Sequence, residues 1–550
     1  MSRIRCAVAV MSLLLISAPL FAQTPPPFGP PVNAGRTLSV NDMTNLAPLI
    51  PIDVYRSPAP SSQDLATFAW LSFISAVSPV SPNQRGTTGG SFASSGQNQK
   101  ATLLWETYQH RAELFPFNAA GTGVPPQPWN SAPKYVESIN NGNQPASIPF
   151  SNYNLLDETT QIGQNILFLP TTTGKPQPAT DAQVLFEAKV NQYEWGFVNS
   201  NYKTLIPVFT PTFYLKGGIT LPTGTVEVKA AWRPLSSIPA AQQYRYHISN
   251  VITFTGTDAA PVAKVVPYAL MALHIIHKSP NYPTFTFSTF EQIDDLTNQV
   301  TGQPSGVYYV PAYTGVQYTT PPTTTFPPFN QTVPNPTLAP VAFNPAAPTA
   351  NPNGQSKALP NGNVSGFPGA ISVGGGRYAI PVTQPVTITP GVQAVNNQAY
   401  AVMKQIPGYN NNFVWQYYKL AGIQAVPSSN DTTSDFYLAN IVVESSQPGI
   451  QLFRGFPPIP PAPAPQVLNN MRNQVNVIDS YGGTKTNYQM GGCQGCHGIA
   501  QTQNGFDFSF LFFGVNGGGF SPETVGLPAP VVAATRVVNR KAFVMPTTPK

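Results

Sequence analysis

The spacing of apolar positions changes period along this 550-residue chain, and the first part has helical spacing. Residues 61–76 predict a helix, because apolar and small side chains recur every three or four positions. Ser61 with Asp64 forms a capping-box-like start to this helix. Residues 103–115 and 180–200 have similar spacing and predict two further helices. We therefore expect a helical N-terminal part.

The middle of the chain changes to the two-residue period of β-strands. Strands are expected over residues 225–232, 244–254, 264–277, 284–290, 413–420 and 436–444. In the third of these, Ala272, His274 and Ile276 would share one face. The expected fold class is α+β, with a β-rich central region.

A long segment after residue 296 lacks the marks of regular structure. Residues 296–356 contain no charged residue and are rich in Pro, Thr and Asn. Proline removes the hydrogen-bond donors that a strand needs. We interpret residues 296–400 as an irregular Pro/Thr/Asn-rich insertion laid over the β region, with partial disorder as the alternative.

The first 22 residues have the pattern of a secretory signal peptide. Arg3 and Arg5 precede a short apolar run, and small residues stand before Gln23. The run is shorter than the ~20 apolar residues that span a bilayer. We expect cleavage after Ala22, a mature chain without a transmembrane segment, and a periplasmic or secreted location. An uncleaved N-terminal anchor is the alternative.

Composition excludes one class of partner. Only 9% of the residues are charged, against ~25% in typical soluble proteins. The formal net charge is +6 and no basic run occurs. Nucleic-acid binding is therefore not expected.

The cysteines carry the most specific chemistry. The chain has three, and removal of the signal leaves only Cys493 and Cys496. With His497 they form C-x-x-C-H, which is the attachment motif of c-type haem. Two thiols in one tight turn can form thioethers to the two haem vinyl groups, and the adjacent imidazole can bind the iron as proximal ligand. One covalently attached haem c is therefore expected.

Other uses of this motif were weighed. A thioredoxin-like pair would need a surrounding βαβ pattern, which the sequence lacks. A Cys-rich zinc site would need a further ligand, and no other cysteine remains after cleavage. A plain disulfide is compatible with an exported protein. The adjacent His497 favours haem over all three.

The distal iron ligand stays open at this point. Met545 is the only methionine or histidine downstream of His497, and a distal methionine raises the potential of simple c-type cytochromes. His274 or His277, reaching over from the β region, is the second option. An open five-coordinate iron is the third. For both histidines the plainer interpretation is a buried, hydrogen-bonded residue on a strand.

Two further places were considered as sites. Glu227 and Lys229 alternate onto one face of a strand, where they would line a pocket or, more commonly, face solvent. Asp507 precedes an apolar run and is interpreted as a helix cap.

Several segments, in order along the chain, resemble a family of long exported bacterial proteins described as cytochrome-c-like. They are Phe68–Phe73, Leu104–Thr107, Val226–Arg233, Leu273–Lys278, Ser288–Gln292, Leu438–Asn440 and Asp507–Leu511. The resemblance implies a large N-terminal region followed by one C-terminal haem motif. Family members tend to have histidine where this chain has Gln292, so the resemblance implies no metal ligand there. It implies no particular reaction.

Together these patterns predict a signal peptide over residues 1–22, a large β-rich region over 23–465, and a small helical haem region over 466–550. The expected function is electron transfer through the haem, with redox partner proteins. A mono-haem oxidase, peroxidase or oxygenase with an open iron is the alternative. The large non-haem part favours an enzyme, whereas the lack of recognisable acid–base residues favours a carrier.

Overall fold

The computed structural model covers the β-rich region and short parts of the rest. It describes residues 25–114 except 83, 125–131, 133, 154–156, 185–205, 220–257, 260–293, 307–311, 371–374, 377–381, 390–425, 474–478, 485–489, 507, 509 and 511. The predicted signal peptide lies outside these residues, as does most of the predicted haem region. Among the helices that are described, none has the length and apolar character needed to span a bilayer.

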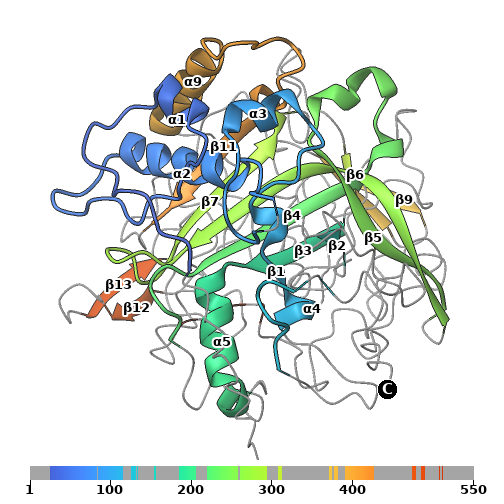
Figure 1. Ribbon diagram of the computed structural model, residues 1–550, viewed down its shortest axis with the longest axis horizontal. Coiled ribbons are helices and arrows are strands. Elements are labelled where there is room, and N and C mark those ends of the chain that lie inside the picture. The colour runs from blue at the N-terminus through green and yellow to red at the C-terminus, as the bar shows by residue number, and fades with distance from the viewer. Residues whose placement is uncertain are drawn as a thin grey trace, which may run out of the picture.

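The fold is mixed α+β and is built on an eight-stranded sheet (Figure 1). Its strands are β1 (Gln109–His110), β2 (Asn154–Leu155), β3 (Leu185–Val190), β4 (Val226–Pro234), β5 (Ile248–Thr257), β6 (Ala260–His277), β7 (Thr286–Gln292) and β11 (Tyr418–Gln424). The order is β1-β3-β4-β6-β5-β2, and β7 joins β6 to β11. All pairs are antiparallel except β2 with β5.

The 18-residue strand β6 organises the sheet. Its first part pairs with β5, and its second part lies between β4 and β7. Smaller sheets are formed by β8 (Val307–Pro311), β9 (Ile371–Gly374) and β10 (Arg377–Pro381), and by β12 (Gln474–Ile478) with β13 (Lys485–Gln489).

Helices cover one face of the large sheet (Figure 1). They are α1 (Val40–Thr44), α2 (Ser62–Ala76), α3 (Phe92–Gln97) and α9 (Pro390–Met403). In the same view α4 (Arg111–Leu114) and α5 (Gln192–Leu205) lie below the sheet. Short 3₁₀ turns occur at Trp105–Thr107, Leu235–Ser237, Ala240–Arg245 and Val414–Tyr417.

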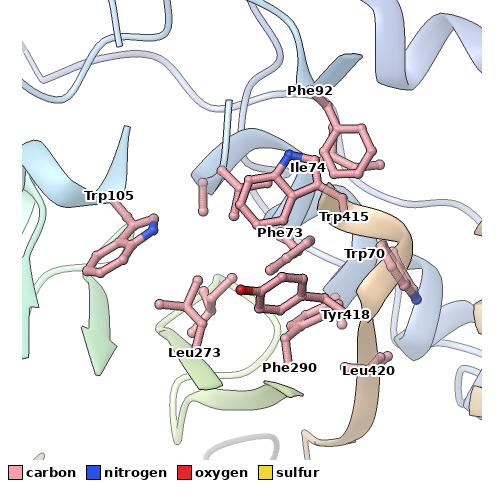
Figure 2. Close-up of a cluster of buried hydrophobic side chains, with 14 of the residues drawn as sticks. Trp70, Phe73, Ile74, Phe92, Trp105, Leu273, Phe290, Trp415, Tyr418 and Leu420 are labelled. Atoms are coloured by element: carbon pink, nitrogen blue, oxygen red, sulfur yellow. The ribbon is translucent and has the colours of Figure 1, made fainter. Parts of the chain in front are cut away.

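Aromatic side chains hold α2 to the sheet (Figure 2). Phe73 stacks on Phe290 of β7 with ring centroids 4.0 Å apart, and Trp70 meets Phe290 edge-on at 5.1 Å. Trp415, just before β11, meets Phe73 edge-on at 5.6 Å. Full burial of such a side chain contributes about 1.5–3 kcal/mol. These contacts therefore make the helix-covered face of the sheet the main apolar core.

Local signals predicted several elements correctly. The helix over 61–76 is confirmed as α2, with the capping box of Ser61 and Asp64 in place. Four strands in the middle of the chain are confirmed as β4, β5, β6 and β7, with end positions that differ by a few residues. The strand predicted over 413–420 begins later, at Tyr418, because a 3₁₀ turn precedes it. The strand predicted over 436–444 lies outside the described residues.

Two predicted helices are wrong in part. Residues 103–115 contain a 3₁₀ turn, strand β1 and only four residues of helix. Residues 185–190 form strand β3, and the helix α5 begins only at Gln192. In both places the segment pairs with a neighbouring strand, β1 with β3 and β3 with β4. Hydrogen bonding within the sheet outweighs the local helical period.

The end of the predicted insertion also differs from expectation. Residues 390–403, placed in the insertion near 296–400, form α9, which packs on α2 and β11. Buried Val392, Val395 and Ala399 lie at helical spacing along it. The short strands β8, β9 and β10 are the other described parts of that range.

Candidate functional site

Strand alternation gives the large sheet a second face with polar side chains. On β6, Leu273 and Ile275 belong to the apolar core, so His274 between them projects to the opposite side. We call the following residues of that side the polar face: Glu227 and Lys229 of β4, His274 of β6, Thr289 and Glu291 of β7, and Lys419 of β11. Lys229 is half-buried and the others are buried. A buried sheet face with this many ionisable groups is unusual, because charged side chains are rarely buried.

One row of the polar face runs across three strands. Lys229, His274 and Thr289 are direct cross-strand neighbours. The Nε2 atom of His274 lies 2.6 Å from Oγ1 of Thr289. The hydroxyl of Thr289 therefore engages this imidazole nitrogen.

A second row places an acidic residue across from a basic one. Glu291 of β7 stands directly across from Lys419 of β11, and both side chains are buried. Burial raises the pKa of Glu291 to about 7, although Lys419 acts in the opposite direction. This carboxyl therefore titrates in the physiological range.

Three carboxyl groups meet at the β4 end of the polar face. We call Glu194, Glu227 and Asp507 the acid cluster. Glu194 lies in the first turn of α5. Its backbone N–H donates a hydrogen bond to the side-chain oxygen of Asn191, just before the helix. The same Asn191 donates to the carbonyl of Gly224, just before β4. This cap fixes the start of α5 against β4 and brings Glu194 to Glu227.

Asp507 reaches the cluster from a distant part of the chain. Its Oδ2 accepts a hydrogen bond of 2.7 Å from the backbone N–H of Leu221 and lies 2.5 Å from Nζ of Lys278. The hydroxyl of Ser509 hydrogen bonds to the carboxyl of Glu227. Asp507 and Ser509 are both buried, so these contacts place the two residues beside β4 and the end of β6.

The electrostatics of the cluster favour a bound proton. Burial, and then the charge of Glu227, hold the pKa of Glu194 well above its ordinary value. Burial raises the pKa of Glu227 to about 7, even though Ser509 and Glu194 donate hydrogen bonds to it. Two adjacent carboxyls that cannot both ionise titrate as a pair.

His277 is buried by aromatic packing. Its ring is parallel to Phe28 and to Phe68, with centroids 5.3 Å and 5.8 Å away. Burial lowers its pKa to about 3, so the imidazole is neutral at physiological pH. Neither ring nitrogen has a hydrogen-bond partner among the described residues. Both predicted histidines are thus buried, but only His274 is seen to be hydrogen bonded in the way expected of a structural residue.

A separate polar network lies on the apolar side of the sheet. Glu106 Oε1 accepts from Asn154 Nδ2 at 2.8 Å and lies 3.4 Å from Nε2 of His247. Lys189 donates to the backbone carbonyl of Glu106 at 2.6 Å. Burial raises the pKa of Glu106, but the charge of His247 and the hydrogen bonds outweigh it, and the net shift is downward. This network ties β3, β2 and the start of β5 together, and neither ring nitrogen of His247 has a hydrogen-bond partner among the described residues.

The predicted haem residues lie outside the described part of the chain. They are Cys493, Cys496, His497 and the predicted distal ligand Met545. Within the described residues, no group of three or more His, Cys, Asp or Glu side chains is arranged to hold a metal ion. Gln489, the last residue of β13, lies four positions before Cys493, and Asp507 lies ten positions after His497.

Sequence reasoning found part of the polar face and missed the rest. Glu227 and Lys229 were identified as a same-face pair, but Glu227 is buried and does not face solvent. The side chain of Asp507, interpreted as a helix cap, binds Lys278 and Leu221, and most of the apolar run that it would cap lies outside the described residues. Glu194 was missed, although Asn191 followed by Glu three positions later is a helix-start signal. Three of the segments that carry the family resemblance, Val226–Arg233, Leu273–Lys278 and Ser288–Gln292, lie side by side in the sheet, and Asp507 of a fourth binds Lys278.

Comparison of the chain with protein-family models, with curated proteins and with solved structures gave no match.

Proposed function

We propose that this chain is an exported c-type mono-haem protein that transfers electrons through one covalently attached haem. The carrying observation is the motif Cys493–His497, whose two cysteines are the only ones left after removal of the predicted signal peptide. The resemblance of the chain to long exported cytochrome-c-like proteins supports the same function. Bound there, haem would supply reversible one-electron exchange between Fe(III) and Fe(II).

In this proposal each residue of the motif has a distinct role. Cys493 and Cys496 hold the haem through thioethers, and His497 binds the iron on the proximal side. Met545 is the proposed distal ligand. The region 466–550, which contains the strands β12 and β13, would form a small haem unit and exchange electrons with redox partner proteins in the periplasm or outside the cell.

The experiment is production of the mature protein with c-type haem maturation in the periplasm, followed by mass and optical spectra. We expect a mass increased by one haem and a spectrum that resists extraction of the cofactor. Cys496→Ala should abolish two-bond attachment, whereas Gln494→Ala, at a spacer position of the same motif, should retain it. An unchanged haem content and spectrum in Cys496→Ala would refute the proposal.

A second function is favoured by the acid cluster. A haem enzyme needs groups that deliver protons, and burial raises the pKa of Glu227 to about 7 and that of the neighbouring Glu194 well above its ordinary value. Glu227 contacts the segment that begins ten residues after His497. The same spectra separate the two functions. Low-spin haem with a methionine–iron band supports Met545 and electron transfer, and high-spin haem that shifts with carbon monoxide or peroxide supports an enzyme.

A further inference from the structure

Aromatic side chains form a continuous chain through the core of the protein. Neighbouring rings in it have centroids 5.6 to 6.4 Å apart. We call these residues the aromatic chain, and in order they are Tyr400, Trp70, Phe73, Trp415, His247, Trp232 and Trp105. Tyr400 is half-buried and the other members are buried. The aromatic chain thus leads from α9, past α2 (Figure 2), to β4 within the sheet.

The composition of the aromatic chain gives it a possible redox chemistry. Tryptophan and tyrosine are, with cysteine, the side chains that lose one electron most readily. Electron transfer weakens steeply with distance, so short steps between rings let an oxidising equivalent move through a protein. The rings of Phe73 and His247 are harder to oxidise and bridge the steps on either side of Trp415. Aromatic packing also serves simply to stabilise a core, so the partners of the indole nitrogens decide whether one member is redox-active.

Trp232 has the partner that an oxidisable indole needs. Its Nε1–H donates a hydrogen bond of 2.8 Å to Oε1 of Glu187, and both side chains have no exposed surface. The other carboxyl oxygen of Glu187 lies 3.5 Å from Nζ of Lys189. An indole that has lost an electron is a far stronger acid than indole itself. The adjacent carboxylate can therefore take the Nε1 proton and leave a neutral radical, which avoids a buried positive charge on the ring.

The other five indoles of the sequence lack a carboxylate partner. Trp70 donates to the amide oxygen of Asn396, and Trp415 donates to the hydroxyl of Ser95. Trp129 and Trp195, which lie outside the aromatic chain, donate to backbone carbonyls. These neutral oxygens are too weakly basic to take a proton from the oxidised ring.

The two ends of the aromatic chain are also less easily oxidised than Trp232. The Nε1–H of Trp105 has no acceptor among the described residues, and the ammonium group of Lys189 lies 5.6 Å from its ring centroid. This positive charge opposes a second positive charge on the ring. The hydroxyl of Tyr400 donates to the backbone carbonyl of Tyr418, which cannot take its proton. An oxidising equivalent in the aromatic chain is therefore most stable on Trp232.

We propose that Trp232 is a redox-active residue, oxidised through the aromatic chain to a neutral tryptophan radical whose proton is held by Glu187. One electron leaves the indole for the oxidant, and the Nε1 proton moves to Oε1 of Glu187. Reduction by one electron returns the proton. The oxidant is a strong one-electron acceptor, and in the alternative haem enzyme it would be the haem after reaction with peroxide. Only this last role rests on the proposed function.

The test is flash oxidation of the mature protein by a photogenerated ruthenium(III) complex in solution. Trp195→Phe serves as the parent protein, because Trp195 is the one half-buried tryptophan and would react directly. We expect the transient absorption of a neutral tryptophan radical in the parent and its loss on Trp232→Phe. Trp129→Phe, which removes a buried tryptophan outside the aromatic chain, should retain the signal. An undiminished signal after Trp232→Phe would overturn the proposal.

Two further variants test the proton acceptor and the route. Glu187→Gln keeps an oxygen for the indole N–H but cannot take the proton, so the transient spectrum should shift to that of the radical cation. A neutral-radical spectrum in Glu187→Gln would refute the role of Glu187, since a merely structural hydrogen bond leaves the spectrum unchanged. Trp415→Phe removes an oxidisable ring and should slow the oxidation of Trp232. An unchanged rate would refute transfer through the aromatic chain.

A measurement on the parent protein covers the case in which Trp232→Phe does not fold. After continuous illumination in air, peptide mass spectrometry should find oxygen added to Trp232 although its side chain is fully buried. Modification confined to other residues would overturn the proposal.

The haem and the radical can fail separately. Photo-oxidation needs no haem, and haem content does not depend on Trp232. Peroxide added to the haem-loaded protein should produce the same radical, detected by electron paramagnetic resonance. If light produces the radical and peroxide does not, Trp232 is redox-active but the haem is not its oxidant.

Discussion

Asn396 of α9 connects three elements through one amide group. Its Oδ1 accepts from Nε1 of Trp70 at 2.9 Å and from the backbone N–H of Leu420 at 3.1 Å. Its Nδ2 donates to the carbonyl of Leu420 at 2.9 Å. The side chain is 1% exposed, so water cannot replace these partners. Asn396 thus fixes α9 against both α2 and β11.

Asn396→Ala should lower the free energy of unfolding by about 2–4 kcal/mol, because it leaves the Trp70 and Leu420 groups buried without partners. Denaturant unfolding measures the change. Asn397→Ala is the matched control, since Asn397 is the next residue of the same helix, is exposed and accepts a hydrogen bond from Gln393 one turn earlier. It should change stability by less than about 0.5 kcal/mol. Equal effects of the two substitutions would contradict this role.

At the scale of elements, close packing is visible at a helical glycine. Gly96 is a buried residue of α3. A Cβ atom at this position would stand 2.2 Å from the ring of Phe413. Gly196 lies in α5, and a Cβ atom there would meet nothing within 4 Å. Replacement of glycine by alanine should therefore have opposite effects on stability at these two positions.

Gly96→Ala should destabilise the protein by about 1–3 kcal/mol, because the ring of Phe413 must move within a packed region. Gly196→Ala should stabilise it by up to about 1 kcal/mol, because alanine favours the helix and meets no obstacle. Thermal unfolding of the two variants side by side measures both effects. A stabilised Gly96→Ala protein would show that α3 and the segment around Phe413 are not packed together.

The same scale shows where sequence patterns succeed. The start of α2 was predictable because Ser61 and Asp64 satisfy each other's backbone groups within four residues. Strand β3 was assigned to a helix because its pairing partner, β4, comes more than thirty positions later and leaves no trace in the local spacing. Helix α9 was overlooked because a long proline-rich segment precedes it and its partners, α2 and β11, are distant.

At the scale of the whole molecule, buried ionisable groups determine how stability depends on pH. Burial raises the pKa values of Glu227 and Glu291 from the ordinary 4.5 of a glutamate to about 7. The folded state binds these protons more tightly, so stability decreases as the pH rises from about 4.5 to 7. Burial lowers the pKa of His277 from 6.5 to about 3, so its contribution is lost as the pH falls through that interval.

Two carboxyls outweigh one imidazole where the intervals overlap, so we expect maximum stability near pH 5 and a loss of about 1–3 kcal/mol by pH 8. Calorimetry or circular dichroism from pH 3 to pH 9 measures this profile. Glu291→Gln should flatten the alkaline side, since it removes one of the titrating groups. A wild-type maximum above pH 7 would show that these carboxyls are not protonated in the folded state.

The sequence by itself determined what depends on neighbouring residues: the capped start of α2, the alternation of β4, β6 and β7, and the proposed haem motif Cys493–His497 with its two cysteines. Each rests on spacing of a few positions. Only the tertiary structure decided that Glu227 is buried, that Glu194 lies beside it and that Asp507 binds Lys278. These contacts join residues far apart in sequence, and the burial that raises the pKa values of Glu194 and Glu227 exists only once α5 and the sheet have come together.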